Sequence, residues 1–131
     1  FAVLVTVNAD LFGEDASKAS SLEKIATRIA LAAFNTETVK KSQVAFGVNH
    51  WSEVSGTMVN CNGLLQKLSA APTAPDAALV PAYRALTALA GNEVTETSAA
   101  YKLAQGEAPA LVNVSFESIR STGYMLDGVK A

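Results

Sequence analysis

The chain has 131 residues, a formal net charge of −2 and one cysteine. Half of its residues are hydrophobic and 17% are charged, fewer than the roughly 25% of an average soluble domain. The length fits one domain, the scattered basic residues exclude nucleic acid as the main partner, and the single cysteine excludes an internal disulfide.

The first nine residues are mainly apolar, and Val3, Val5 and Val7 alternate as in a strand. Val7-Asn8-Ala9 also matches the small-residue end of a signal peptide, which hints that the protein is secreted or otherwise exported. Two interpretations therefore stay open for residues 1–9, an ordered apolar arm or the remnant of a signal peptide. No run reaches the roughly 20 apolar residues of a membrane span, so we expect none.

The next segment predicts a helix over residues 18–34. Leu22, Ile25 and Ile29 are spaced at three and four, with Glu23 and Lys24 off their face. Asp15 or Ser17 can cap its start, because their side-chain oxygens accept hydrogen bonds from the free backbone N–H groups there.

Residues 49–68 carry the longest helical pattern. Their apolar side chains recur at intervals of three and four: Trp51, Val54, Met58, Cys61, Leu65 and Leu68. We expect an amphipathic helix whose apolar stripe other segments cover, with Cys61 buried on it. The residues just before are ambiguous, because Val44, Phe46 and Val48 alternate as in a strand.

The prolines of residues 71–76 predict a connector, with Asp76 able to cap the next helix. Further helices are expected at 77–90 and 94–105. The last segment, 110–126, reads as a strand on Val112, Val114 and Phe116 and as a helix on a three-and-four spacing. The helix is favoured, because Pro109 suits a helix start.

Together these elements predict an all-α fold, a single helical-bundle domain spanning 1–131 with four to five helices and an apolar N-terminal arm. The alternative is an α+β fold with strands near 2–8, 43–50 and 110–117.

No motif identifies a reaction. His50 is the one histidine, and Glu53 would lie within its reach on a helix, but a hydrogen-bonded boundary histidine is the simpler interpretation. His50 and Cys61 lack the further ligands of a zinc site. The acids of residues 10–15 lack the spacing of a calcium loop. We therefore expect no catalytic residue, no metal and no cofactor.

The apolar balance favours a non-enzymatic structural or interaction subunit that self-associates or docks on a larger assembly. It would do so through apolar helix faces and its N-terminal arm, with a protein partner or a homo-oligomer as the expected assembly. The expected interaction residues are Phe1, Val3, Val5, Val7 and Trp51.

Two other hypotheses remain. The first is a small helical carrier of an apolar ligand or pigment, whose cavity would be lined by His50, Trp51, Met58, Leu65 and Tyr83. The second, which is the least favoured, is an enzyme that depends on His50.

Overall fold

The computed structural model describes residues 2–71, 78–120 and 122–126, and the chain divides into two compact units. The first unit comprises Phe1–His50 and Ala74–Leu86, and the second comprises Trp51–Thr73 and Thr87–Ala131. The single domain expected for 1–131 stays a prediction, because compactness alone does not show that a unit folds independently.

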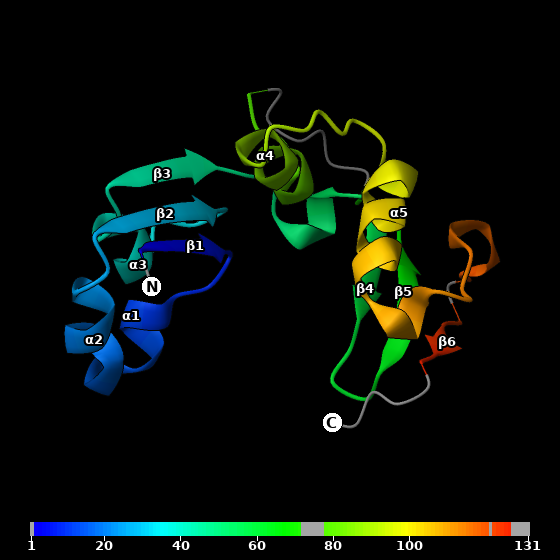
Figure 1. The fold of residues 1–131 in the computed structure, drawn as a ribbon, viewed down its shortest axis with the longest axis horizontal. Coiled ribbons are helices and arrows are strands. Elements are labelled where there is room, and N and C mark those ends of the chain that lie inside the picture. The colour runs from blue at the N-terminus through cyan, green and yellow to red at the C-terminus, as the bar shows by residue number, and fades with distance from the viewer. Residues whose placement is uncertain (1, 72–77, 121, 127–131) are drawn as a thin grey trace. The chain divides into compact units, whose positions relative to one another are not determined.

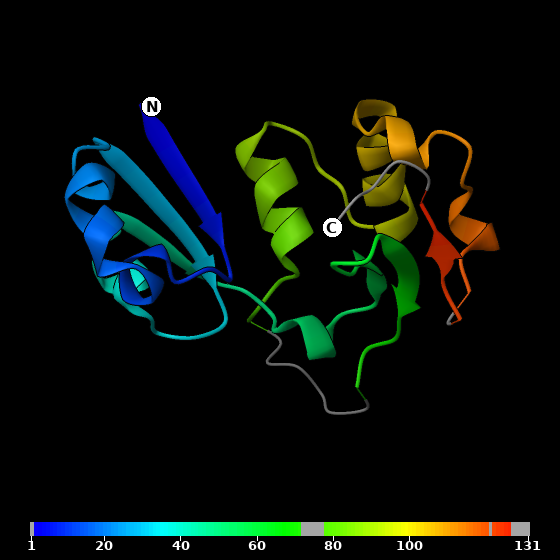
Figure 2. The same cartoon turned by 90° about the horizontal axis from the view of Figure 1, so that it is seen from below.

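The first unit is built on a parallel sheet with the strand order β1-β2-β3 (Figure 1). Its strands are β1 (Val3–Val7), β2 (Thr27–Ala32) and β3 (Val44–Gly47). The connections hold α1 (Leu11–Glu14), the 3-10 turn η1 (Ala16–Lys18), α2 (Ala19–Glu23) and α3 (Glu37–Lys40). Figures 1 and 2 show α1, α2 and α3 on the same side of the sheet, as successive crossovers of one hand require.

Side-chain caps start α1, α3 and η1 of this unit. Asp10 accepts a hydrogen bond from the N–H of Gly13 at α1, and Thr36 accepts one from the N–H of Val39 at α3. Asp15 caps η1 by the same kind of contact, which confirms the cap predicted there. These caps let helices of only four residues form between the strands.

Beyond β3 the sheet is extended by a single bridge. Val48 pairs in parallel with Val80, and the N–H of Asn49 donates to the carbonyl of Val80 across 3.1 Å. Val80 leads into α4 (Ala82–Leu89).

The second unit contains an antiparallel sheet with the order β4-β5-β6, packed against α5 (Figure 1). Its elements are η2 (Trp51–Glu53), β4 (Gly56–Val59), β5 (Leu64–Leu68), α5 (Thr97–Glu107), η3 (Pro109–Leu111), η4 (Phe116–Ser118) and β6 (Tyr124–Met125). Its core consists of Leu65, Tyr101, Val114, Ile119 and Leu126.

The predicted helical bundle is wrong, because the structure is a mixed α/β fold with two sheets. Residues 49–68, the expected central helix, form the η2 turn and the β4–β5 hairpin instead. Asn60 and Gly63 form the turn between the two strands. The side-chain oxygen of Asn60 accepts hydrogen bonds from the N–H groups of Asn62 and Leu64, each at 2.9 Å, and Gly63 adopts a φ of +78°. A turn closed in this way stabilises two strands where the spacing alone suggested one helix.

The other predicted helices can be compared with the structure in the same way. The helix expected at 18–34 ends at Glu23, because residues 27–32 are drawn into the centre of the parallel sheet. Helices lie within the segments expected to be helical at 77–90 and 94–105, as α4 and α5, but α4 begins only at Ala82, because Val80 pairs with Val48, and α5 begins at Thr97. Segment 110–126 is neither a long helix nor a strand over 110–117, since η3 and η4 occupy it.

The alternative α+β fold placed strands near 2–8 and 43–50, and β1 and β3 lie there. Asp76 and most of the connector at 71–76 lie outside the described residues.

Candidate interaction surface

One face of the parallel sheet is made almost wholly of apolar side chains. Successive side chains of a strand point to opposite faces, so residues paired across in-register strands share a face. In the register, Val5 pairs with Ile29 and Ile29 pairs with Val44. The face that contains this row, here called the open sheet face, consists of Val3, Val5, Val7, Thr27, Ile29, Leu31, Val44 and Phe46.

The side chains on its outer strands are strongly exposed. Val3, Val5 and Val7 of β1 are 51%, 41% and 38% exposed, and Val44 and Phe46 of β3 are 42% and 47% exposed. Leu31, near the carboxyl end of the central strand, is fully buried. The exposed apolar side chains of the face are therefore those of its two outer strands.

The other face of the same sheet is covered by the helices. Thr6 and Ala30 lie on it and are buried. Arg28 also lies on it, and its Nη1 donates to the carbonyls of Glu23 at 3.1 Å and Ile25 at 2.6 Å. These contacts tie the sheet to the end of α2.

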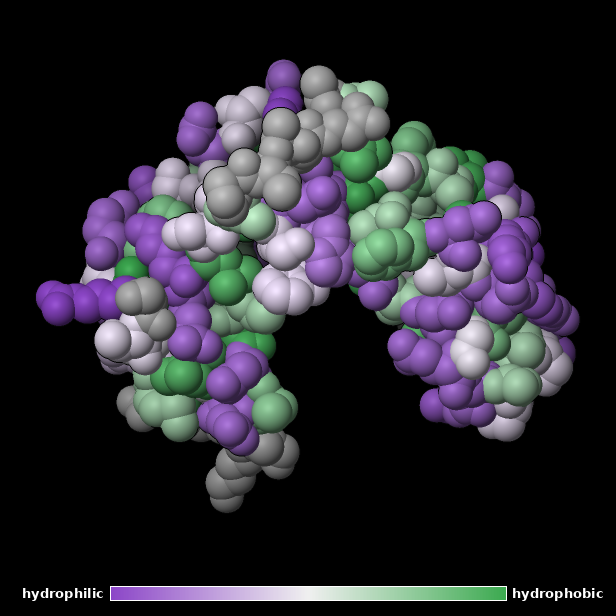
Figure 3. Space-filling model, turned by 180° about the vertical axis from the view of Figure 1, so that it is seen from behind, coloured by the Kyte–Doolittle hydropathy of each residue, from purple (hydrophilic) through white to green (hydrophobic). Residues whose placement is uncertain are grey.

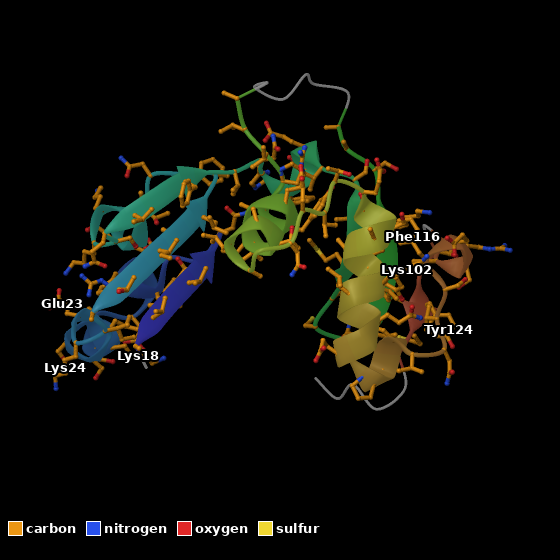
Figure 4. The ribbon with its side chains drawn as sticks, turned by 45° about the horizontal axis from the view of Figure 1, so that its top comes forward. Lys18, Glu23, Lys24, Lys102, Phe116 and Tyr124 are labelled. Atoms are coloured by element: carbon orange, nitrogen blue, oxygen red, sulfur yellow. The ribbon has the colours of Figure 1, made fainter. Side chains whose placement is uncertain are left out.

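Charge is segregated in the same way. Arg28 is the one charged residue in β1, β2 and β3, and it points to the helical side. The helical layer carries the ion pairs Lys18–Asp15, Lys40–Glu37 and Lys41–Glu23, and Figure 4 shows Lys18, Glu23 and Lys24 at this layer. The open sheet face thus offers a partner apolar contact without a charge to desolvate.

A group of polar side chains lies at the carboxyl ends of the strands, the edge where α/β sheets bind ligands. Asn8, with a φ of +48°, accepts the N–H of Ala33 at 2.8 Å. The ring of His50 lies against that of Phe34, with centroids 5.3 Å apart. The Nδ2 of the buried Asn49 has no hydrogen-bond partner among the described residues.

Asp10 lies at the same edge, and its carboxylate connects two helices of the first unit. Its Oδ1 accepts the N–H of Thr38 at 2.9 Å, the hydroxyl of Thr38 at 3.0 Å and the N–H of Gly13 at 3.3 Å. These hydrogen bonds, above all that from the Thr38 N–H, hold the pKa of Asp10 below its ordinary value. The carboxylate therefore fastens α1 to α3.

The second unit contains a shallow pocket of about 230 Å³ between α5 and the residues after it in the chain. Tyr101 and Phe116 form its aromatic part, with ring centroids 5.6 Å apart, and Lys102 lies on its wall (Figure 4). Burial raises the pKa of the Tyr101 hydroxyl, which donates to the carbonyl of Val114 at 3.0 Å. The Tyr101 hydroxyl thus satisfies a carbonyl of the protein's own backbone.

Apolar side chains also reach the surface of the second unit (Figure 3). Met58 and Met125 are 44% and 59% exposed, and the register places both on the face of the second sheet that points away from Leu65. Cys61 is exposed in the β4–β5 turn, so the prediction that it is buried is wrong.

The predicted interaction residues fall in different places. Val3, Val5 and Val7 come together on the open sheet face. Phe1 lies outside the described residues. Trp51 is exposed at the start of the second unit.

The residues predicted to line a ligand cavity belong to two different units. His50 belongs to the first unit and Tyr83 lies on α4, whereas Met58 and Leu65 belong to opposite faces of the second sheet. The carrier hypothesis stays untested, but the helical bundle on which it depended is absent.

Ile29, Leu31, Val44 and Phe46 belong to the open sheet face and were not predicted as interaction residues. The alternation of Val44 and Phe46 was the available signal. It could not reveal that these residues share a face with Val5, because in-register pairing is a tertiary feature.

No protein-family model matches the chain, and a search of the curated proteins finds no match either. Within residues 2–71, 78–120 and 122–126, no group of three or more histidine, cysteine or acidic side chains is placed to hold a metal ion. None of the helices described has both the length and the apolar character needed to cross a membrane.

Proposed function

We propose that this protein is an interaction subunit that docks on a protein partner through the open sheet face. The observation that carries the proposal is the exposure of Val3, Val5, Val7, Val44 and Phe46 on one uncharged face. Parallel sheets occur almost always with both faces covered, and here α1, α2 and α3 cover one. The uncovered face is therefore the natural place for a second layer.

The five exposed side chains supply one part of the free energy that docking needs. Full burial of a Val or Phe side chain stabilises by about 1.5–3 kcal/mol, and each of these five side chains is roughly half exposed. Covering them contributes on the order of 5 kcal/mol, before the cost of association is subtracted. Because association costs at least about 4 kcal/mol, the apolar surface of the partner and contacts at the rim must supply the rest of the affinity.

Site-specific photocrosslinking tests the proposal. A benzophenone amino acid replaces Val5 in the full chain, in cells that make the protein naturally, and crosslinked products are identified by mass spectrometry. The matched control places the same amino acid at Ser20, which is exposed on α2 in the helical layer.

We expect a reproducible product from position 5 that position 20 does not give. Val44→Thr in the same chain should reduce it, because Val44 lies in the same row of the face as Val5. The absence of a product from position 5, or equal products from both positions, would overturn the proposal.

A further inference from the structure

The sequence contains one acceptor motif for N-linked glycosylation, Asn113-Val114-Ser115. The motif is an asparagine followed two positions later by serine or threonine, with any residue except proline between them. No other asparagine of the sequence is followed in this way. Because so short a motif also arises by chance, its surroundings in the structure decide whether it can carry a glycan.

The motif lies in the loop between η3 and η4, and this loop presents both of its polar residues to solvent. Asn113 and Ser115 are exposed, whereas Val114 between them is 3% exposed and belongs to the core of the second unit. The carbonyl of Val114 accepts hydrogen bonds from the hydroxyl of Tyr101 and from Nε2 of Gln105, each at 3.0 Å. The buried valine thus fastens the middle of the motif to α5 and leaves its two ends at the surface.

The folded chain has room for a sugar at this position. Asn113 lies on the wall of the shallow pocket of the second unit, together with Val112 and Phe116, and Figure 4 shows Phe116 in the same loop. Val112, the residue before Asn113, is 58% exposed. A hydrophilic oligosaccharide on Asn113 would therefore cover an apolar side chain that now faces water.

We propose that Asn113 carries an N-linked oligosaccharide. Its side-chain Nδ2 attacks the anomeric carbon of the first sugar of an oligosaccharide that is linked to a lipid pyrophosphate. The new N–C bond forms as the bond from that carbon to the pyrophosphate oxygen breaks. The lipid pyrophosphate leaves, and Nδ2 loses one proton. The hydroxyl of Ser115 is the part of the motif that the transferring enzyme recognises.

This modification goes beyond the proposed function and does not depend on it, because Asn113 belongs to the second unit and the open sheet face belongs to the first. The transferring enzyme acts in the secretory pathway, so the proposal includes export of the protein, which Val7-Asn8-Ala9 also suggested. A glycan without docking and docking without a glycan are separate results.

Mass spectrometry of the full chain, purified from cells that make it naturally, is the first test. A peptide N-glycosidase in water enriched in heavy oxygen releases the oligosaccharide and converts the glycosylated asparagine into an aspartate that carries the heavy isotope. We expect this label at Asn113 and not at Asn35 or Asn92, which are exposed but lack the motif. A sample incubated without the enzyme should carry no label. An Asn113 that the enzyme leaves unlabelled would overturn the proposal.

Variants of the full chain in the same cells test the motif itself. Asn113→Gln keeps a carboxamide that is no acceptor, and Ser115→Ala removes the hydroxyl, so both should lose the gain in electrophoretic mobility that the glycosidase causes in the wild-type chain. Ser115→Thr keeps a hydroxyl and should retain that gain. A gain that persists in Asn113→Gln would overturn the assignment to this residue.

Ser115 also has a structural role, because its Oγ accepts the N–H of Ser118 at 3.2 Å and caps η4. Mobility is therefore measured in cell lysate and medium together, where a variant that folds poorly is still detected. The oligosaccharide is added before the chain folds, so poor folding of Ser115→Ala does not by itself remove it. Loss of the glycan in both Asn113→Gln and Ser115→Ala then supports the motif.

Discussion

The hydroxyl of Thr38 donates a hydrogen bond to the Oδ1 of Asp10 across 3.0 Å, and its oxygen accepts the backbone N–H of Phe12 at 3.1 Å. The Thr38 side chain is almost fully buried. A single hydroxyl therefore links the start of α3 to the carboxylate and the backbone of α1. The helical layer of the first unit depends on this contact, because its helices are too short to be stable alone.

Thr38→Val tests this link. The substitution keeps the shape of the side chain but leaves the N–H of Phe12 buried without its acceptor, which costs about 1–3 kcal/mol. We expect urea denaturation to show that loss in the free energy of unfolding. Thr38→Ser keeps the hydroxyl and should cost less; equal losses for Val and Ser would mean that packing, and not the hydrogen bond, sets the effect.

The Asp10 carboxylate predicts an acid-sensitive stability. Because the hydrogen bonds from Thr38 lower its pKa from 3.8, its contribution is fully present above that pH and is lost as the pH falls through the lower, folded-state value. Asp10→Asn should therefore lower the Tm at pH 6, by roughly 5 °C. The gap to the wild-type chain should narrow below pH 3.8, as thermal unfolding at both pH values would show. Glu14→Gln is the matched control, since it removes a neighbouring charge and leaves the Asp10–Thr38 contact; a gap independent of pH would contradict the assignment.

The sequence predicted the elements that depend mainly on interactions between residues close together in the chain. The cap at Asp15 and the helices α4 and α5 were found from side-chain chemistry and periodicity. The β4–β5 hairpin was missed because apolar residues spaced at three and four also occur when two strands are joined by a four-residue turn. Asn60 and Gly63 indicated that turn, but the prediction followed the three-and-four spacing of apolar residues over 49–68 instead.

The open sheet face could be predicted only in part. The alternation of Val3, Val5 and Val7 marked these residues as an apolar surface, and they are exposed. Val44 and Phe46 complete the surface through parallel pairing with β2, whose own sequence reads as helix over 18–34. Tertiary pairing overrides helical propensity there, and a single sequence carries no direct signal of it.

Substitution of three glycines by alanine should change the free energy of unfolding by different amounts, because the glycines differ in φ and in the space around them. Gly106 lies in α5 with open space around it, so Gly106→Ala should stabilise by about 0.5–1 kcal/mol. Gly91 also has open space but a φ of +77°, so Gly91→Ala should destabilise by about 1–2 kcal/mol. At Gly123, with a φ of +90°, an added Cβ would lie 2.7 Å from Cδ1 of Leu64, so Gly123→Ala should cost roughly 1 kcal/mol more than Gly91→Ala. Chemical denaturation of the three variants checks this order, and any other order would show that φ and steric space do not govern these sites.

The carbonyl of Val114 accepts two hydrogen bonds, from the hydroxyl of Tyr101 and from Nε2 of Gln105, each at 3.0 Å. Tyr101→Phe should therefore cost only about 0.5–1.5 kcal/mol, because Gln105 still satisfies the carbonyl. Removing both donors in Tyr101→Phe/Gln105→Leu should cost more than the sum of the single losses. A double-mutant cycle in urea measures this, and strict additivity would contradict a shared acceptor.

Residues of the open sheet face differ in burial, so substitutions on it should differ in their effect on the free energy of unfolding. Val5 is 41% exposed, so Val5→Thr, which keeps a β-branched side chain in β1, should change the free energy of unfolding by no more than about 1 kcal/mol. Leu31 is fully buried on the same face, so Leu31→Ala should cost about 2–5 kcal/mol. Urea denaturation of the purified chain measures both. A large loss for Val5→Thr would mean that Val5 already packs within the monomer, and the face would then be part of the core and not a surface that awaits a partner.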